Sequence, residues 1–128
     1  MYHDYEAAMK FIIAIGSNYQ SEQALALARL LLKENVSDII FSDEMKTKAI
    51  GIDAPDFVNC IAKGSTKMSY DELNTLFKNI EEKCGNSREL RKKNLVKMDI
   101  DILLYGKNKY HIDDWNRDYI KALTKEFI

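Results

Sequence analysis

Residues 11–35 read FIIAIGSNYQSEQALALARLLLKEN, and this stretch decides how the fold begins. The apolar run 11–15 predicts a first strand that ends in a turn at Gly16, Ser17 and Asn18. Beyond the turn, apolar residues recur at intervals of three and four, the period of one helix face, and predict a helix that opens at Ser21. We expect this helix to end at Asn35 and to bury Ala24, Leu27, Ala28 and Leu31.

The rest of the chain adds further strands and helices. Segments 37–45 and 57–63 have strand-forming compositions, and the long connection 46–56 between them is of the kind that often carries function. A capping box of Ser69 and Glu72 predicts the start of a second helix, and Gly85 its C-terminal cap. A strand over 98–105 and a helix from about Asp113 follow. The expected apolar stripe of the second helix comprises Leu73, Leu76, Phe77 and Ile80.

The order of these elements, β-α-β-β-α-β plus a terminal helix, indicates an α+β fold of the ferredoxin-like type. In that fold an antiparallel sheet carries helices on one face, and here a C-terminal helix is added. A length of 128 residues is typical of one domain. We expect a flexible lead-in over residues 1–8 and a single domain over residues 9–128. The fold type by itself does not determine the chemistry.

The composition excludes several classes of protein. With 19 basic and 20 acidic residues the net charge is −1, which argues against binding to nucleic acid through bulk positive charge. Cys60, Cys84, His3 and His111 lack the spacing of a zinc site, and the apolar run 11–15 is far too short to cross a bilayer. We expect a cytoplasmic monomer with reduced thiols and small-molecule substrates, without a nucleic-acid or membrane partner.

The most informative residues are Asp99 and Asp101, which lie within the apolar segment 98–105. Side chains alternate along a strand, so the two carboxylates share one face, roughly 6.5–7 Å apart. Two like charges on a predicted central strand require neutralisation. Magnesium is a good candidate because it takes carboxylate and phosphate oxygens; the alternative is a solvated sheet face on which the aspartates pair with lysines.

Three blocks resemble the 6-hydroxymethyl-7,8-dihydropterin pyrophosphokinases of folate synthesis. They read IAIGSN over 13–18, PDFVN over 55–59 and MDIDILLYG over 98–106, in the order and near the spacing of that family. The resemblance covers roughly residues 11–122. It implies transfer of the β,γ-diphosphoryl unit of ATP to the hydroxymethyl group of the reduced pterin, with release of AMP, and two magnesium ions held by Asp99 and Asp101.

The resemblance also implies the substrate-binding residues. An aromatic pair would enclose the pterin ring while two polar side chains bind its edge, an arrangement that suits a flat heterocycle. On this basis we expect the pterin to contact Phe57, Tyr119, Asn59 and Thr47. The residues that match ATP-binding positions of the family are Glu81, Arg88, Ile102 and Arg117, of which Arg88 would also act in catalysis. We also expect Lys92 and Lys97 to bind ATP, because they keep positive charge in the loop before the acidic strand.

The loop 86–97 departs from the family pattern, which has arginines for the phosphates. Asn86 replaces the first arginine, Arg88 is kept, and residues 94–96 (NLV) replace a G-P-R triplet. Lysine attracts phosphate but lacks the bidentate guanidinium fork. The family has a segment with proline and histidine after the acidic strand, whereas residues 107–114 contain no proline and we do not assign His111 as a substitute for the family's histidine. We therefore expect a short, divergent member. Two alternatives stay open: a catalytically impaired relative that binds nucleotide or pterin without turnover, and an RNA-binding module, which the aspartates disfavour.

Overall fold

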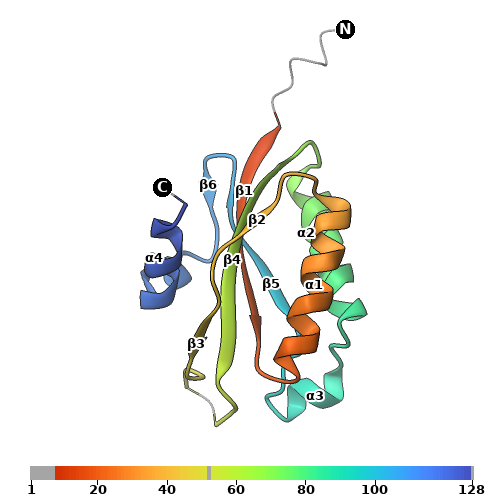
Figure 1. The fold of residues 1–128 in the computed structure, drawn as a ribbon, viewed down its shortest axis with the longest axis vertical. Helices are drawn as coiled ribbons and strands as arrows, with labels where there is room; N and C mark the ends of the chain where they lie inside the picture. Colours follow the sequence, from red (N-terminus) through yellow and green to blue (C-terminus); the bar gives the residue numbers. More distant parts are fainter. Residues whose placement is uncertain (1–7, 52, 128) are drawn as a thin grey trace, which may run out of the picture.

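The computed structural model describes residues 8–51 and 53–127 (Figure 1). Its strands form a six-stranded sheet in the order β2-β4-β1-β5-β6, in which β3 also pairs with β4 and each pairing is antiparallel. This order confirms the ferredoxin-like prediction. Residues 1–7 of the predicted lead-in lie outside the described residues. The strands are β1 (Met9–Ser17), β2 (Ile40–Phe41), β3 (Met45–Thr47), β4 (Phe57–Thr66), β5 (Asp99–Tyr105) and β6 (Asn108–Lys109).

The helices cover the two faces of the sheet unequally. Helices α1 (Ser21–Asn35) and α2 (Tyr70–Lys83) pack on one face over the larger hydrophobic core, while α4 (Asp118–Lys125) lies on the opposite side (Figure 1). A smaller cluster under α4 contains Ile61, Leu103, Ile120 and Leu123. A short helix, α3 (Arg88–Lys92), lies within the predicted basic loop, and a 3₁₀ helix (Ile112–Asn116) precedes α4.

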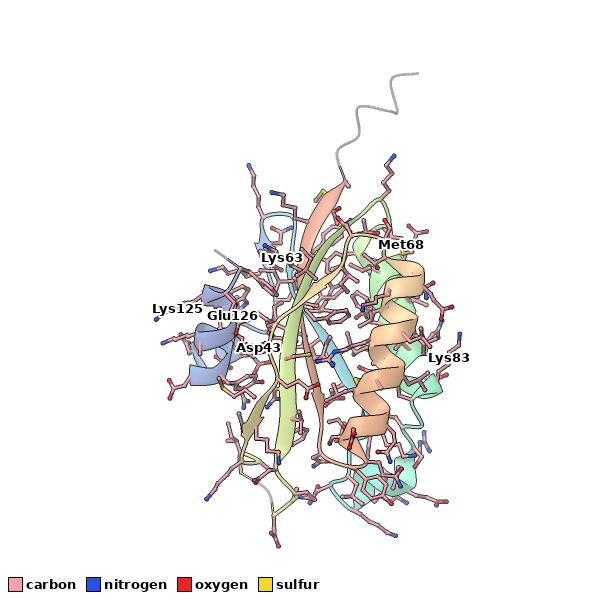
Figure 2. The ribbon with its side chains drawn as sticks, viewed as in Figure 1. Asp43, Lys63, Met68, Lys83, Lys125 and Glu126 are labelled. Carbon is pink, nitrogen blue, oxygen red and sulfur yellow. The ribbon has the colours of Figure 1, made fainter. Side chains whose placement is uncertain are left out.

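The end of α4 is held against the sheet by polar contacts. The backbone N–H of Asp43, between β2 and β3, donates to Glu126 Oε2 at 3.3 Å. Lys63 Nζ of β4 donates to the backbone carbonyl of Phe127 at 3.3 Å and lies 4.9 Å from the centre of the Phe127 ring. Figure 2 shows Asp43, Lys63 and Glu126 in this region. These contacts fix α4 over the face of the sheet that carries Asp99 and Asp101.

The buried face of α1 differs from the predicted one. Leu25 and Leu32 are 2% and 0% exposed, whereas Leu27 is 37% exposed. Ala24 and Ala28 are buried as expected, and Leu31 packs at the margin of the core. The prediction was wrong about Leu27 because leucines surround much of this helix, so its apolar pattern is compatible with more than one face.

Helix α2 follows its sequence signals closely. The Glu72 N–H donates to Ser69 Oγ at 3.2 Å, and the Ser69 N–H donates to Glu72 Oε1 at 2.9 Å. This confirms the capping box. Leu73 and Phe77 are fully buried, and Gly85 follows with a φ of +101°, the left-handed conformation expected after a helix end.

The strand that carries the aspartates lies at the sheet edge over half its length. Strand β5 pairs with β1 from Asp99 to Tyr105, but β6 pairs only with Leu104 and Tyr105. The prediction of a central strand is therefore wrong for the half that contains Asp99 and Asp101. The chain reverses at Gly106 (φ +62°) into a strand of only two residues, which is too short to cover this half.

The predicted strand over 37–45 is divided into β2 and β3 by residues 42–44. Ser42 causes the division, because its Oγ accepts the Ile61 N–H of β4 at 2.9 Å in place of a backbone carbonyl. The terminal helix is likewise divided. Arg117 has an extended backbone and separates the 3₁₀ helix from α4.

Candidate active site

A hollow of about 260 Å³ opens on the face of the sheet that α4 partly covers. It lies where β1, β4 and β5 run side by side, because Gly16 pairs with both Asn59 and Asp99. Residues from β3, the following loop and α4 complete its wall. Seven of the predicted site residues line it: Thr47, Phe57, Asn59, Asp99, Asp101, Arg117 and Tyr119. They come from four separate parts of the sequence.

One side of the hollow is aromatic and amide in character. Asn59 is only 5% exposed, and its Nδ2 donates to Thr47 Oγ1 at 2.7 Å and to the Met45 carbonyl at 3.3 Å. This orients the amide so that its oxygen faces β1 near Gly16. Phe57 starts β4 and Tyr119 lies in α4, so two aromatic rings from different elements border one space. Burial raises the pKa of Tyr119, so its phenol is neutral at physiological pH.

Gly16 contributes to this geometry, although the sequence analysis assigned it only to a turn. The structure places it in β1, where a Cβ would lie 3.0 Å from Asn59 Oδ1 and 3.6 Å from Phe57 Cδ1. A larger side chain would displace the amide that lines the hollow. The signal was present in the sequence, because a glycine within a strand often marks a close approach.

The opposite wall contains the two aspartates on the same face of β5, as their spacing predicted. Arg91 of α3 lies 3.2 Å from Asp99 Oδ1, and Lys78 of α2 lies 3.5 Å from Asp101 Oδ1. His111 Nε2 is 3.9 Å from the same Asp101 oxygen. Both carboxylates therefore have cationic neighbours, as the solvated-face alternative required, but their side chains remain 39% and 35% exposed and accessible from the hollow.

The chemistry of this pair suits a magnesium ion shared with phosphate. Among residues 8–51 and 53–127, no group of three or more His, Cys, Asp or Glu side chains is close enough to hold a metal alone. Magnesium usually takes only one or two carboxylates and completes its shell with water and substrate phosphates. Two accessible carboxylates beside a hollow fit that requirement.

The remaining predicted ATP-binding residues do not line the hollow. Ile102 is 1% exposed and belongs to the core under α1 and α2, because strand alternation turns it away from Asp101. Glu81 is buried and accepts the Ile100 N–H at 2.7 Å. Arg88 and Lys92 are exposed on α3, and Lys97 packs across Gly85. Their proposed contacts with ATP remain predictions.

Asn86, which the sequence analysis matched to an arginine of the family pattern, has a structural role. Its Oδ1 accepts the N–H groups of Lys97 and Met98, both at 3.0 Å, and its Nδ2 donates to the Met98 carbonyl. Asn18 holds the preceding residues, since its side chain accepts the Val96 N–H and donates to the Asn94 carbonyl at 2.6 and 2.9 Å. These bonds shape the entry into β5 and thereby position Asp99.

Residues that the sequence analysis did not select also border the site. Lys48, Ile50 and Asp114 line the hollow, and Asp114 binds Arg117 Nε at 2.9 Å. No short-range sequence pattern pointed to Lys78, because its contact with Asp101 joins helix α2 to a residue of strand β5 that follows 23 positions later.

None of the helices in the described part of the chain combines the length and apolar character needed to span a bilayer.

Comparisons with known proteins identify the family. The model of the family described as 7,8-dihydro-6-hydroxymethylpterin-pyrophosphokinase matches residues 12–126. A 2-amino-4-hydroxy-6-hydroxymethyldihydropteridine pyrophosphokinase of Haemophilus influenzae is 33% identical over 120 residues, covering 84% of this chain and 74% of the relative. A folate synthesis bifunctional protein of Arabidopsis thaliana is 30% identical over 125 residues, which is 87% of this chain but only 25% of the relative. On these matches, the chain belongs to the 7,8-dihydro-6-hydroxymethylpterin-pyrophosphokinase family.

Proposed function

We propose that the chain is a magnesium-dependent pyrophosphokinase that transfers the β,γ-diphosphoryl unit of ATP to 6-hydroxymethyl-7,8-dihydropterin and releases AMP. The observation that carries the proposal is the convergence of Phe57, Asn59 and Tyr119 with Asp99 and Asp101 around one hollow. The first three residues suit a flat, polar-edged ring, and the two carboxylates suit a metal–phosphate complex. Neither half alone would distinguish a pterin enzyme from other small-molecule enzymes.

The size of the hollow supports separate binding places for the two substrates. About 260 Å³ lies just below the usual range of ligand pockets, roughly 300–1,000 Å³, and suits one heterocycle but not a nucleotide as well. The pterin would lie between Phe57 and Tyr119, with the side-chain amide of Asn59 at its polar edge. ATP would then approach from the β5 edge, where Lys78 and Arg91 supply positive charge.

In the proposed reaction, the hydroxymethyl oxygen of the pterin forms a bond to the β-phosphorus of ATP. The bond from that phosphorus to the oxygen of the α-phosphate breaks, AMP leaves with the electron pair, and the hydroxyl proton passes to solvent or a nearby base. Magnesium held by Asp99 and Asp101 would neutralise phosphate charge. The protein contributes mainly by holding the hydroxyl and the phosphate chain in line.

The direct test is AMP release from ATP by the pure chain, measured with and without magnesium and with and without the hydroxymethyl pterin. Turnover that requires both is expected, and a working family member serves as the positive control. Asp99→Ala and Asp101→Ala should each abolish turnover without unfolding the chain, whereas Asp113→Ala, which removes an exposed acid outside the hollow, should not. Unchanged rates in the first two variants would refute the metal-binding role.

The alternative, a relative that binds without turnover, is favoured by one observation. Asn86 occupies a phosphate-binding arginine position and is engaged in backbone hydrogen bonds instead. Calorimetry separates the two functions, because the impaired relative would bind pterin or ATP normally while releasing no AMP. Binding of neither ligand would contradict both proposals.

A further inference from the structure

The open edge of β5 is covered by two side chains of α2 instead of a neighbouring strand. Glu81 Oε2 accepts the Ile100 N–H at 2.7 Å, and Lys78 Nζ donates to the Ile100 carbonyl at 3.0 Å. Ile100 lies between the two aspartates. A lysine and a glutamate one helical turn apart therefore satisfy both backbone groups that β6 leaves unpaired at this position.

Lys78 is thereby fixed at the border of the candidate site. Its Nζ lies 3.0 Å from Glu81 Oε2 and 3.5 Å from Asp101 Oδ1, and its side chain is 45% exposed. Two of its three contacts, to Glu81 and to the Ile100 carbonyl, lie outside the hollow. The ammonium group would thus remain beside Asp101 even when that carboxylate binds another cation.

The charges near the acidic pair are nearly balanced. Three carboxylates, those of Asp99, Asp101 and Glu81, lie close to two permanent cations, Lys78 and Arg91. Burial lowers the pKa of Lys78, but its hydrogen bond to Glu81 and the charges of Glu81 and Asp101 outweigh this effect, and the pKa lies above its ordinary value. Lys78 is therefore positively charged at neutral pH.

From this arrangement, and on the basis of the proposed function, we propose that Lys78 makes the acidic pair select a magnesium–polyphosphate complex over a free divalent cation. A fixed ammonium beside Asp101 repels a bare cation, because like charges at this separation raise its binding free energy. The same ammonium attracts the oxygens of a polyphosphate that arrives with the metal. Lys78 would thus determine the selectivity of the site and supply positive charge that Asn86 does not.

The test measures two binding constants in Lys78→Gln, which removes the charge but keeps a donor for the Ile100 carbonyl. Binding of Mn²⁺ alone, followed by electron paramagnetic resonance, should tighten at least about five-fold, the factor that ~1 kcal/mol represents. Binding of ATP with magnesium, followed by calorimetry, should weaken by about the same factor. Lys83→Gln is the matched control, since Lys83 is an exposed lysine of the same helix (Figure 2).

The two affinities are expected to change in opposite directions, and this distinguishes a loss of selectivity from structural damage. A variant that is merely loosened would lose affinity for both ligands, and that result would overturn the proposal, as would unchanged affinities in both experiments. Circular dichroism checks the fold. If Lys78→Gln is unfolded, Lys78→Met, which removes the charge and leaves Glu81 in place, serves for the same pair of measurements. The Mn²⁺ experiment needs neither pterin nor turnover, so it can succeed if the chain is inactive and fail if it is active.

Discussion

Replacing Glu81 separates a structural role from the predicted role in ATP binding. Both hydrogen bonds of its side chain use one oxygen: Oε2 accepts the Ile100 N–H at 2.7 Å and a hydrogen from Lys78 Nζ at 3.0 Å. Alanine removes this acceptor and leaves a buried backbone N–H unpaired, which costs about 1–3 kcal/mol. Lys78 is 45% exposed and can be rehydrated, so it adds little. We expect Glu81→Ala to lower the free energy of unfolding by ~2–3 kcal/mol.

Glutamine gives the informative contrast. Its amide oxygen can accept both hydrogen bonds in the position of Oε2, so we expect Glu81→Gln to cost less than about 1 kcal/mol. If Glu81 instead contacts ATP through its charge, Glu81→Gln would weaken ATP binding while leaving the stability nearly unchanged. Binding measurements on this one variant therefore test the predicted ATP contact without interference from unfolding.

The assay is guanidinium unfolding followed by far-UV circular dichroism. Glu82→Ala is the matched control, because Glu82 is the exposed neighbour of Glu81 on α2 and surface changes of this kind are usually worth no more than about 0.5 kcal/mol. If Glu81→Ala unfolds at the same denaturant concentration as Glu82→Ala, the hydrogen bond to Ile100 does not support the edge of β5, and the reasoning fails.

Three further predictions concern the pH response and the core. Burial raises the pKa of Glu81, so the folded state holds this proton more tightly than the unfolded state. The free energy of unfolding of the wild type, relative to that of Glu81→Gln, should therefore fall as the pH rises through that pKa. Unfolding titrations in which this difference rises with pH would contradict the prediction. Leu25→Ala should lower the free energy of unfolding by ~2–5 kcal/mol and Leu27→Ala by less than about 1 kcal/mol, because of these two leucines only Leu25 is buried. Denaturant unfolding measures both, and equal losses would support the helix face predicted from the sequence. Burial raises the pKa of Cys60 to about 11, so mass spectrometry should find this thiol unmodified by iodoacetamide in the native protein and alkylated in denaturant.

The shared face of Asp99 and Asp101 was predicted from strand periodicity, whereas the pterin-binding residues were selected from the family resemblance; the same periodicity explains why the two sets lie together. Asp99 and Asp101 are two positions apart, as are Phe57 and Asn59, and antiparallel pairing with β1 then brings the two strands to the same space. The same rule places Ile102 on the opposite face, with its side chain in the core. Applied to Ile102, the rule itself would have argued against a side-chain contact with ATP.

The features that were not predicted depend on contacts between distant segments. No local pattern shows that β6 stops after two residues, and so none shows that Ile100 needs partners from α2. The face of α1 was ambiguous for a related reason, since its leucines satisfy more than one helical stripe and only packing on the sheet selects Leu25 and Leu32. In each case tertiary structure chose among arrangements that the sequence allowed.

The predicted departures from the family pattern in the loop 86–97 are connected to the open edge of β5. The amide of Asn86 closes the entry into β5 with hydrogen bonds that hold the strand carrying Asp99. Positive charge is nevertheless present at the aspartates, supplied by Arg91 from α3 and Lys78 from α2. Lys78 lies at the open edge of β5, which exists because β6 is short. The unpaired edge, the lysine that covers it and the asparagine that shapes the start of β5 thus form one arrangement, in which Lys78 of α2 adds positive charge to that which Arg91 supplies from the loop 86–97.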